Sequence, residues 1–83
     1  MEMYIAYDTE NKTFYATSEI DKAVVVNGDI LACETASEAI DLATSYSRSL
    51  DTNPPMGINV QYCEKRGRYV IYLNGERGCK ACG

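Results

Sequence analysis

The alternation of apolar and polar residues divides the chain into one helical stretch and several short strands. In Glu34–Leu50, small or apolar residues recur at steps of three and four, the spacing of one helix face. Thr35 and Glu38 form a capping box that predicts the helix start, and Pro54 predicts its end. We expect an amphipathic helix over about residues 36–50, packed on a sheet. The apolar face carries Ala36, Ala39, Ile40, Ala43, Ser47 and Leu50, with Leu42 and Tyr46 beside them.

Two strands are predicted before the helix, at residues 4–8 and 13–17. Both runs are rich in Tyr, Ile, Phe and Thr, and the connection between them is polar. A turn centred on Glu10 and Asn11 pairs Tyr7 with Phe14 on the core face.

The middle of the chain allows two readings. Residues 18–22 form either one helical turn capped by Ser18 or a plain connection. Asn27-Gly28 then separates the apolar runs 23–26 and 30–33, a strong hairpin signal. The alternative for residues 23–33 is a single bulged strand that leads into the helix.

A further hairpin is predicted after the helix, from residues 58–64 and 68–73. With Arg66-Gly67 as a two-residue turn, Tyr62 faces Ile71 and Val60 faces Leu73. Strand periodicity then places one set of side chains toward the core, namely Ile58, Val60, Tyr62, Tyr69, Ile71 and Leu73. The opposite face carries Gln61, Cys63, Val70 and Tyr72. Asn74-Gly75 predicts a second turn, followed by an edge strand within 76–82.

These elements predict one α+β domain over residues 1–83. We expect an antiparallel β-sheet of about four to six strands, with the single helix packed on one face. The other face would meet water or a partner. Tyrosines suit such a surface because they offer a large contact area at low entropic cost. The residues expected there are Tyr4, Tyr15, Val70 and Tyr72.

Charge is distributed unevenly along the chain. The net charge is −4, but residues 1–51 hold ten acidic and three basic residues, whereas 52–83 hold two acidic and five basic residues. Such a chain can present two electrostatic faces, unless the charges serve simple solvation. The candidate partner-binding residues are the acidic Asp8, Glu10 and Asp29, the basic Lys65, Arg66 and Arg68, and the tyrosines Tyr4, Tyr15 and Tyr72.

The composition argues against an enzyme. The chain has no histidine, which removes the usual general base at neutral pH and the Ser-His and Cys-His pairs. No phosphate-cradling glycine motif occurs, and no pair of carboxylates is recognisable in a pocket-forming segment. We therefore expect no catalytic residues.

The four cysteines are the sharpest chemical feature. The tail sequence GCKACG has the Cys-x-x-Cys-Gly pattern of zinc knuckles. Without histidine, a tetrahedral zinc site would need Cys33, Cys63, Cys79 and Cys82 together. Free thiols, a redox dithiol and disulfides remain alternatives. No other cofactor is expected.

A nucleic-acid site is conceivable at the predicted hairpin tip. Lys65, Arg66 and Arg68 could neutralise phosphates, and neighbouring tyrosines could stack on bases. The acidic first half of the chain opposes this reading, so direct nucleic-acid binding ranks below protein binding.

Segments from Leu31 to Cys82 resemble small phage-encoded anti-CRISPR proteins of the helix-on-sheet type. The segments concerned are TASEAIDLA at the helix, INVQYCEKRGRYVIYL at the hairpin and NGERGCKAC at the tail. The resemblance implies a non-enzymatic inhibitor that occupies the nucleic-acid path of a type I-F surveillance complex. Its contact residues would include Lys65, Arg66, Arg68 and Tyr72.

Our leading hypothesis is therefore a phage or mobile-element inhibitor that binds a host nuclease or CRISPR complex. It would act by steric and electrostatic occlusion. The alternatives are a zinc-stabilised domain and a nucleic-acid-binding module.

No apolar run approaches the ~20 residues of a membrane helix, and no secretory signal is recognisable, so we expect a cytoplasmic protein without a membrane partner. The sequence leaves a homodimer open.

Overall fold

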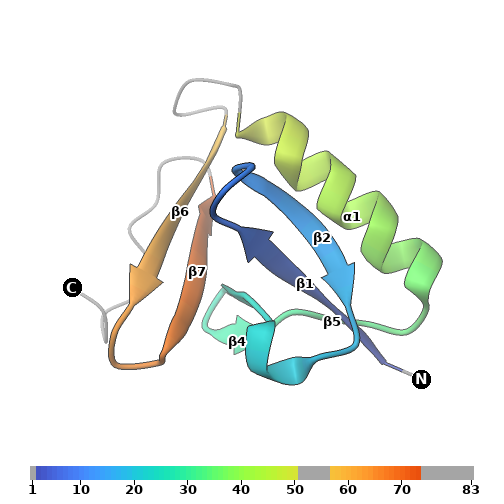
Figure 1. Ribbon diagram of the computed structural model, residues 1–83, viewed down its shortest axis with the longest axis horizontal. Helices are drawn as coiled ribbons and strands as arrows, with labels where there is room; N and C mark the ends of the chain where they lie inside the picture. The colour runs from blue at the N-terminus through green and yellow to red at the C-terminus, as the bar shows by residue number, and fades with distance from the viewer. Residues whose placement is uncertain (1, 51–56, 74–83) are drawn as a thin grey trace.

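The computed structural model of this chain describes residues 2–50 and 57–73 (Figure 1). Within them the elements are, in order, β1 (Met3–Asp8), β2 (Thr13–Thr17), the 3-10 helix η1 (Ile20–Lys22), β3 (Val25–Val26), β4 (Asp29–Ile30), β5 (Ala32–Cys33), α1 (Ala36–Ser49), β6 (Ile58–Cys63) and β7 (Arg68–Leu73).

The strands form two sheets. One has the order β2-β1-β5 and the other β4-β3-β7-β6. All pairings are antiparallel except β3 with β7, which is parallel. The α+β class with one packed helix is confirmed for the described residues, but the expected single sheet is two sheets of three and four strands.

The two sheets separate because the segment before the helix changes partners. The Asn27-Gly28 turn is confirmed, with φ of 56° and 88° as a type I′ turn requires. The run predicted as one strand over 30–33 divides, because Asp29–Ile30 pairs with β3 while Ala32–Cys33 pairs with β1. Val24 links the sheets at this point. Its N–H donates to the Ile5 carbonyl at 2.9 Å, and its carbonyl accepts from the Leu31 N–H at 3.1 Å.

Apolar side chains gather into two buried clusters. The larger lies under α1 and contains Ile5, Phe14, Val24, Val26, Cys33, Ala39, Ala43 and Ile71. The smaller, which we call the second-face cluster, contains Val25, Cys63, Val70 and Tyr72. Strand β7 contributes to both, since alternate residues of a strand point to opposite faces. Both faces of this strand are therefore covered.

The first hairpin follows its predicted register. Tyr7 lies opposite Phe14 and Ile5 opposite Ala16. Residues 18–22 do contain a helical turn, Ile20–Lys22, but its N-cap residue is Glu19 rather than Ser18, and no side chain caps it.

The register predicted for the second hairpin is wrong by two residues. Tyr62 lies opposite Tyr69 rather than Ile71, and Val60 lies opposite Ile71 rather than Leu73. The connection has four residues, 64–67, closed by a bond from the Gly67 N–H to the Cys63 carbonyl at 2.8 Å. Gly67 supplies the left-handed φ of 70° at the end of this loop. A register shift of two residues leaves each side chain on the same face of its strand. The predicted division of side chains between the two faces is therefore unchanged.

The helix begins where the capping box predicted. The Thr35 hydroxyl oxygen accepts the Glu38 N–H at 3.2 Å, and the Glu38 carboxylate accepts the Glu34 N–H at 3.1 Å. Ala39 and Ala43 are buried, but Ile40 is 56% exposed. Ile40 lies about 100° around the helix axis from Ala39, at the edge of the apolar face.

The exposed face predicted for the sheet is largely wrong. Tyr4, Val70 and Tyr72 are buried, and Tyr15 alone of the four residues expected there is exposed, at 39%. For Val70 and Tyr72 the cause is the second-face cluster, which packs residues of β3, β6 and β7 together on the side away from the larger cluster. The proposed turn and strand of residues 74–82 and the prolines after the helix lie outside the described residues.

Candidate functional site

An open groove of about 300 Å³ lies between the two sheets. Residues of β1 and β7 contribute to it, and β2 with η1 and the β6–β7 hairpin border it on either side. We call it the tyrosine groove. Its lining residues are Tyr7, Tyr15, Asp21, Lys22, Tyr62, Gly67, Arg68 and Tyr69.

A row of aromatic rings runs from the core to this groove. The ring centroids of Phe14 and Tyr46 lie 5.8 Å apart, and those of Tyr7 and Phe14 lie 5.0 Å apart. Tyr7 and Tyr69 follow at 5.2 Å, and Tyr62 and Tyr69 at 5.2 Å. The row joins α1, β2, β1, β7 and β6, and such tilted contacts are favourable beyond simple burial. It therefore holds part of the groove lining in place.

Two of the groove tyrosines remain open to solvent. Tyr62 is 54% exposed and Tyr15 is 39% exposed, whereas Tyr7 and Tyr69 are half-buried. Within the described residues, none of the four hydroxyl groups forms a hydrogen bond. The groove therefore offers apolar ring surface together with uncommitted donors.

Arg68 lies at the edge of this groove and stabilises the fold there. Its Nη1 donates to the carbonyls of Ile20 at 3.1 Å and Ala23 at 3.2 Å. These bonds tie η1 to the start of β7. Arg68 was predicted as a partner contact, but its guanidinium is already engaged within the chain.

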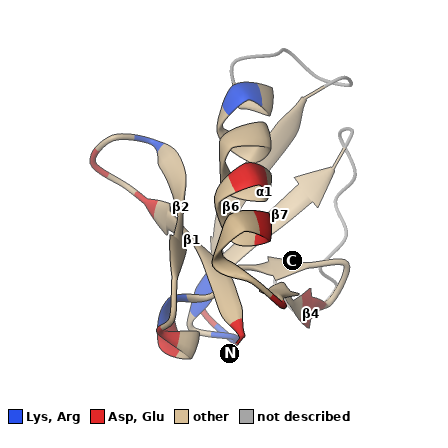
Figure 2. Cartoon of the chain, turned by 90° about the vertical axis from the view of Figure 1, so that its right-hand side faces the viewer, with Lys and Arg blue, Asp and Glu red and all other residues tan. Residues whose placement is uncertain are grey.

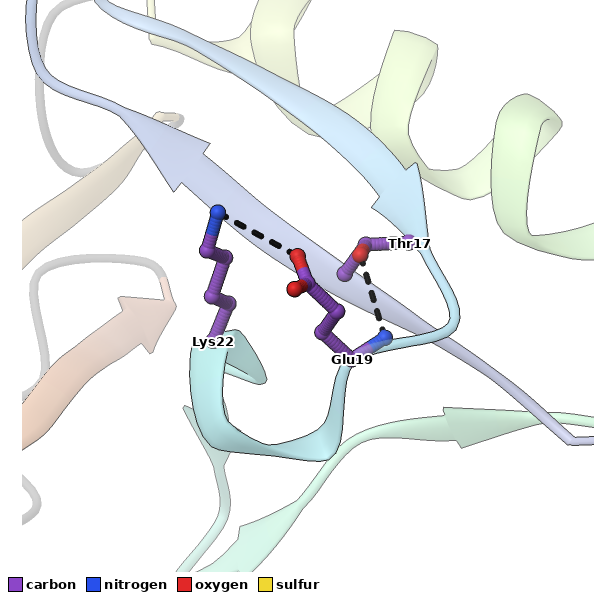
Figure 3. Close-up of polar contacts among 3 residues, drawn as sticks. All are labelled: Thr17, Glu19 and Lys22. Atoms are coloured by element: carbon purple, nitrogen blue, oxygen red, sulfur yellow. Dashed lines mark hydrogen bonds and ion pairs between the residues drawn. The ribbon is translucent and has the colours of Figure 1, made fainter.

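Lys22 is likewise paired within the chain (Figure 3). Its Nζ lies 3.2 Å from a Glu19 carboxylate oxygen, and the Glu19 N–H donates to the Thr17 hydroxyl at 3.1 Å. The bond to Glu19 raises the pKa of Lys22, and the electrostatic attraction of Glu19 and Tyr15 adds to the effect. Lys22 thus remains charged, next to its own counter-ion.

The predicted basic tip lies beside an acidic residue. Arg66 Nη1 donates to the Gly28 carbonyl at 3.3 Å, which brings the tip against the β3–β4 turn that precedes Asp29. Lys65 is exposed. The two predicted sets of charges are therefore mixed here rather than separated on two faces.

The acidic residues predicted to act together lie apart. The β1–β2 turn, which follows Asp8 and holds Glu10, and strand β4, which begins at Asp29, lie far apart, on opposite sides of Figure 2. The Asp8 carboxylate also accepts the Glu10 N–H at 3.0 Å and the Asn11 Nδ2–H at 2.8 Å. The bond from the Asn11 side chain is the main reason that the pKa of Asp8 is lowered.

Tyr4 and Tyr72 are not available as surface contacts. Both are buried, and the Tyr4 hydroxyl donates to the Glu2 carboxylate at 3.0 Å. That bond, followed by burial, raises the pKa of Tyr4. Among the tyrosines predicted as partner contacts, Tyr15 alone lines the groove. The sequence did not predict that the other groove tyrosines, Tyr7, Tyr62 and Tyr69, form one site with it. The signal present in the sequence was the richness of the strands in tyrosine.

The described cysteines do not lie together. Cys33 is free and buried in the larger cluster, whereas Cys63 is disulfide-bonded and lies in the second-face cluster. Because Cys33 is free, the disulfide alternative cannot join all four cysteines. Within residues 2–50 and 57–73, no three potential metal ligands gather. Cys79 and Cys82 lie outside the described residues, so the four-cysteine zinc site stays a prediction, and it would need Cys63 as a reduced thiolate.

A second pocket, of about 490 Å³, lies between β5 and α1 and includes Cys33, Glu38 and Asp41. Burial, with a smaller contribution from the Glu38 charge, raises the pKa of the Cys33 thiol. A thiol of raised pKa is a poor nucleophile, because the thiolate is the reactive form.

No helix in the described part of the chain is long and apolar enough to cross a membrane. The predicted cytoplasmic location stays a prediction, and a bonded Cys63 is unusual for a reducing compartment. Comparison of the chain with protein-family models, curated proteins and solved structures gave no match.

Proposed function

We propose that this chain is a non-enzymatic protein that docks onto a protein partner through the tyrosine groove. The observation that carries the proposal is the pairing of two exposed tyrosines, Tyr15 and Tyr62, with two half-buried ones whose rings are held in the aromatic row. Tyr62 is a surface tyrosine whose ring is fixed by contact with Tyr69, and a side chain fixed in this way binds with little loss of conformational entropy.

The charges support a protein partner over a nucleic acid. Lys22 is paired with Glu19, and Arg68 and Arg66 donate to backbone carbonyls. Phosphate binding draws on cations that are free to replace counterions. Lys65 is the one cation of the proposed basic tip that forms no hydrogen bond or ion pair within the described residues.

For the partner we propose a host nuclease, such as a type I-F CRISPR surveillance complex. The support is the resemblance of the helix and hairpin segments to anti-CRISPR proteins. The chain would act by covering a nucleic-acid-binding surface, with the groove as the anchor and the mixed charges around it as the polar rim.

The test measures target-DNA binding by a purified surveillance complex in the presence of the protein. We expect the wild-type chain to abolish DNA binding and Tyr62→Ala to weaken inhibition by about tenfold or more, as truncation of a tyrosine at an interface centre does. Ile40→Ala is the matched control, because Ile40 is as exposed as Tyr62 but lies on α1, away from the groove. Unchanged DNA binding at saturating protein would remove the nuclease proposal.

Direct binding to the complex separates docking from inhibition. If the complex binds the chain but Tyr15→Ala and Tyr62→Ala bind as tightly as wild type, the groove is not the docking site. Neutralising Asp8, Glu10 and Asp29 in one variant then tests the acidic set predicted from the sequence. A salt-sensitive gel shift with free DNA would instead favour a nucleic-acid-binding module.

A further inference from the structure

We propose that the segment bound in the tyrosine groove is an extended, proline-containing peptide in the polyproline II conformation. This rests on the proposed function, because it specifies which part of a protein partner enters the groove. Grooves lined by aromatic side chains are a recurrent way to bind such segments, whose backbone is already ordered before binding.

The ring geometry favours a ridged ligand over flat bases. The planes of Tyr7 and Tyr69 are inclined by 58°, and those of Tyr62 and Tyr69 by 74°. The centroids of each pair are only 5.2 Å apart, so the rings contact each other at an angle and present a stepped surface rather than a flat stacking platform. A polyproline II helix has three residues per turn, so its pyrrolidine rings project as ridges that can rest against such steps.

The hydrogen-bonding groups of the groove match this backbone. A polyproline II segment makes no internal hydrogen bonds, so its carbonyl oxygens are free acceptors. Proline also lacks an N–H, so the ligand needs hydrogen-bond donors, and no acceptors, from the groove. The hydroxyls of Tyr15 and Tyr62, which form no hydrogen bond within the described residues, are donors at the exposed part of the groove.

The local charge matches an uncharged ligand. Two cations, Lys22 and Arg68, line the groove together with the anion Asp21, and Glu19 pairs with Lys22. The two positive and two negative charges cancel. A phosphodiester strand would bring a negative charge with every nucleotide, whereas a run of prolines brings none. The groove therefore places no net charge against an uncharged proline segment, whereas it offers a phosphodiester strand no net positive charge.

Two features hold the groove in shape before binding. The ring contacts join Tyr62 and Tyr69 of one sheet to Tyr7 of the other, and Arg68 holds η1 against β7. At about 300 Å³ the groove is at the lower end of ligand-site volumes, so it accommodates a short segment and binds it weakly on its own.

The experiment titrates the full chain with a synthetic uncharged oligoproline peptide and follows tyrosine ring resonances by NMR. We expect saturable shifts at Tyr7, Tyr15, Tyr62 and Tyr69. A glycine-serine peptide of equal length should cause none, because it lacks both the pyrrolidine rings and the ordered backbone. Tyr62→Ala should weaken oligoproline binding by roughly tenfold or more, and Ile40→Ala should leave it unchanged.

Tyr15→Ala provides a second variant that preserves the aromatic row, since Tyr15 makes no ring contact within the described residues. It should also weaken binding. The absence of saturable shifts with oligoproline, or equal shifts with the glycine-serine peptide, overturns the inference. So do shifts that depend on protein concentration alone, which would identify a second copy of the chain as the occupant.

The two proposals fail in different ways. If the surveillance complex binds in a Tyr62-dependent manner while oligoproline does not bind, the groove docks a protein segment of another kind. If oligoproline binds but the complex does not, the nuclease is the wrong partner. If Tyr62→Ala changes neither interaction, both proposals are wrong.

Discussion

At the residue scale, several charged side chains that a partner could contact are engaged by the chain's own backbone. Arg68 bonds the carbonyls of Ile20 and Ala23, and Asp8 accepts backbone and side-chain N–H groups of its own turn. Short turns leave backbone groups without ladder partners, and nearby side chains then satisfy them. Charge alone therefore does not show which of these side chains are free to contact a partner.

Asn11→Ala should raise the pKa of Asp8 toward its usual 3.8, because the Asn11 side chain is the main cause of the lowered value. A carboxyl whose pKa is lower in the folded state stabilises the fold above its unfolded pKa. That contribution is lost as pH falls through the folded value. NMR titration of the Asp8 carboxyl carbon measures the change. Asn59→Ala, an exposed change on β6, should leave the Asp8 titration unaltered.

At the element scale, the sequence predicted the helix and the hairpins well, and their mutual placement less well. The capping box at Thr35 and the Asn27-Gly28 turn are both confirmed. These signals are local, since each depends on groups within a few residues. The register of the β6–β7 hairpin was wrong because the faces of a strand repeat every two residues, so the pattern fits either loop length.

One contact joins α1 to the outer strand of its sheet. The Ser47 hydroxyl oxygen accepts the Phe14 N–H at 2.8 Å, in a partly buried position at the edge strand β2. The helix therefore covers an edge group that would otherwise lack a partner.

Ser47→Ala should destabilise the protein by about 1–2 kcal/mol relative to Ser45→Ala, because it leaves the Phe14 N–H without its acceptor. Both changes replace serine by alanine in the same helix, so the gain in helix propensity cancels in the comparison. Urea unfolding of the two variants measures the difference. Equal stabilities would show that water replaces the hydroxyl without cost.

At the scale of the whole molecule, the decisive feature is that the chain builds two sheets rather than one. The parallel pairing of β3 with β7 brings residues 25–26 beside residues 70–71. This pairing closes the second-face cluster and buries Val70 and Tyr72. The same arrangement brings Tyr7 against Tyr69 and so creates the groove.

Reduction should destabilise the protein, because Cys63 is disulfide-bonded within the second-face cluster. We expect a reducing agent to lower the free energy of unfolding by about 2–4 kcal/mol, the range typical of a native disulfide. Cys33→Ser should respond to the reducing agent as wild type does, since Cys33 is free. Cys63→Ser should not respond at all. Thermal unfolding with and without reductant measures the three cases, and an unaltered melting temperature of the wild type would contradict the expectation.

The sequence by itself determined what depends on neighbouring residues: the amphipathic helix, its cap, the turn at Asn27-Gly28 and the faces of the strands. These follow from backbone sterics, capping and side-chain periodicity, which act over a few positions. The tertiary structure decided which strands pair, which tyrosines are buried and which rings meet at the groove. Those outcomes depend on contacts between segments far apart in the chain, such as Tyr7 with Tyr69, and periodicity carries no information about such partners.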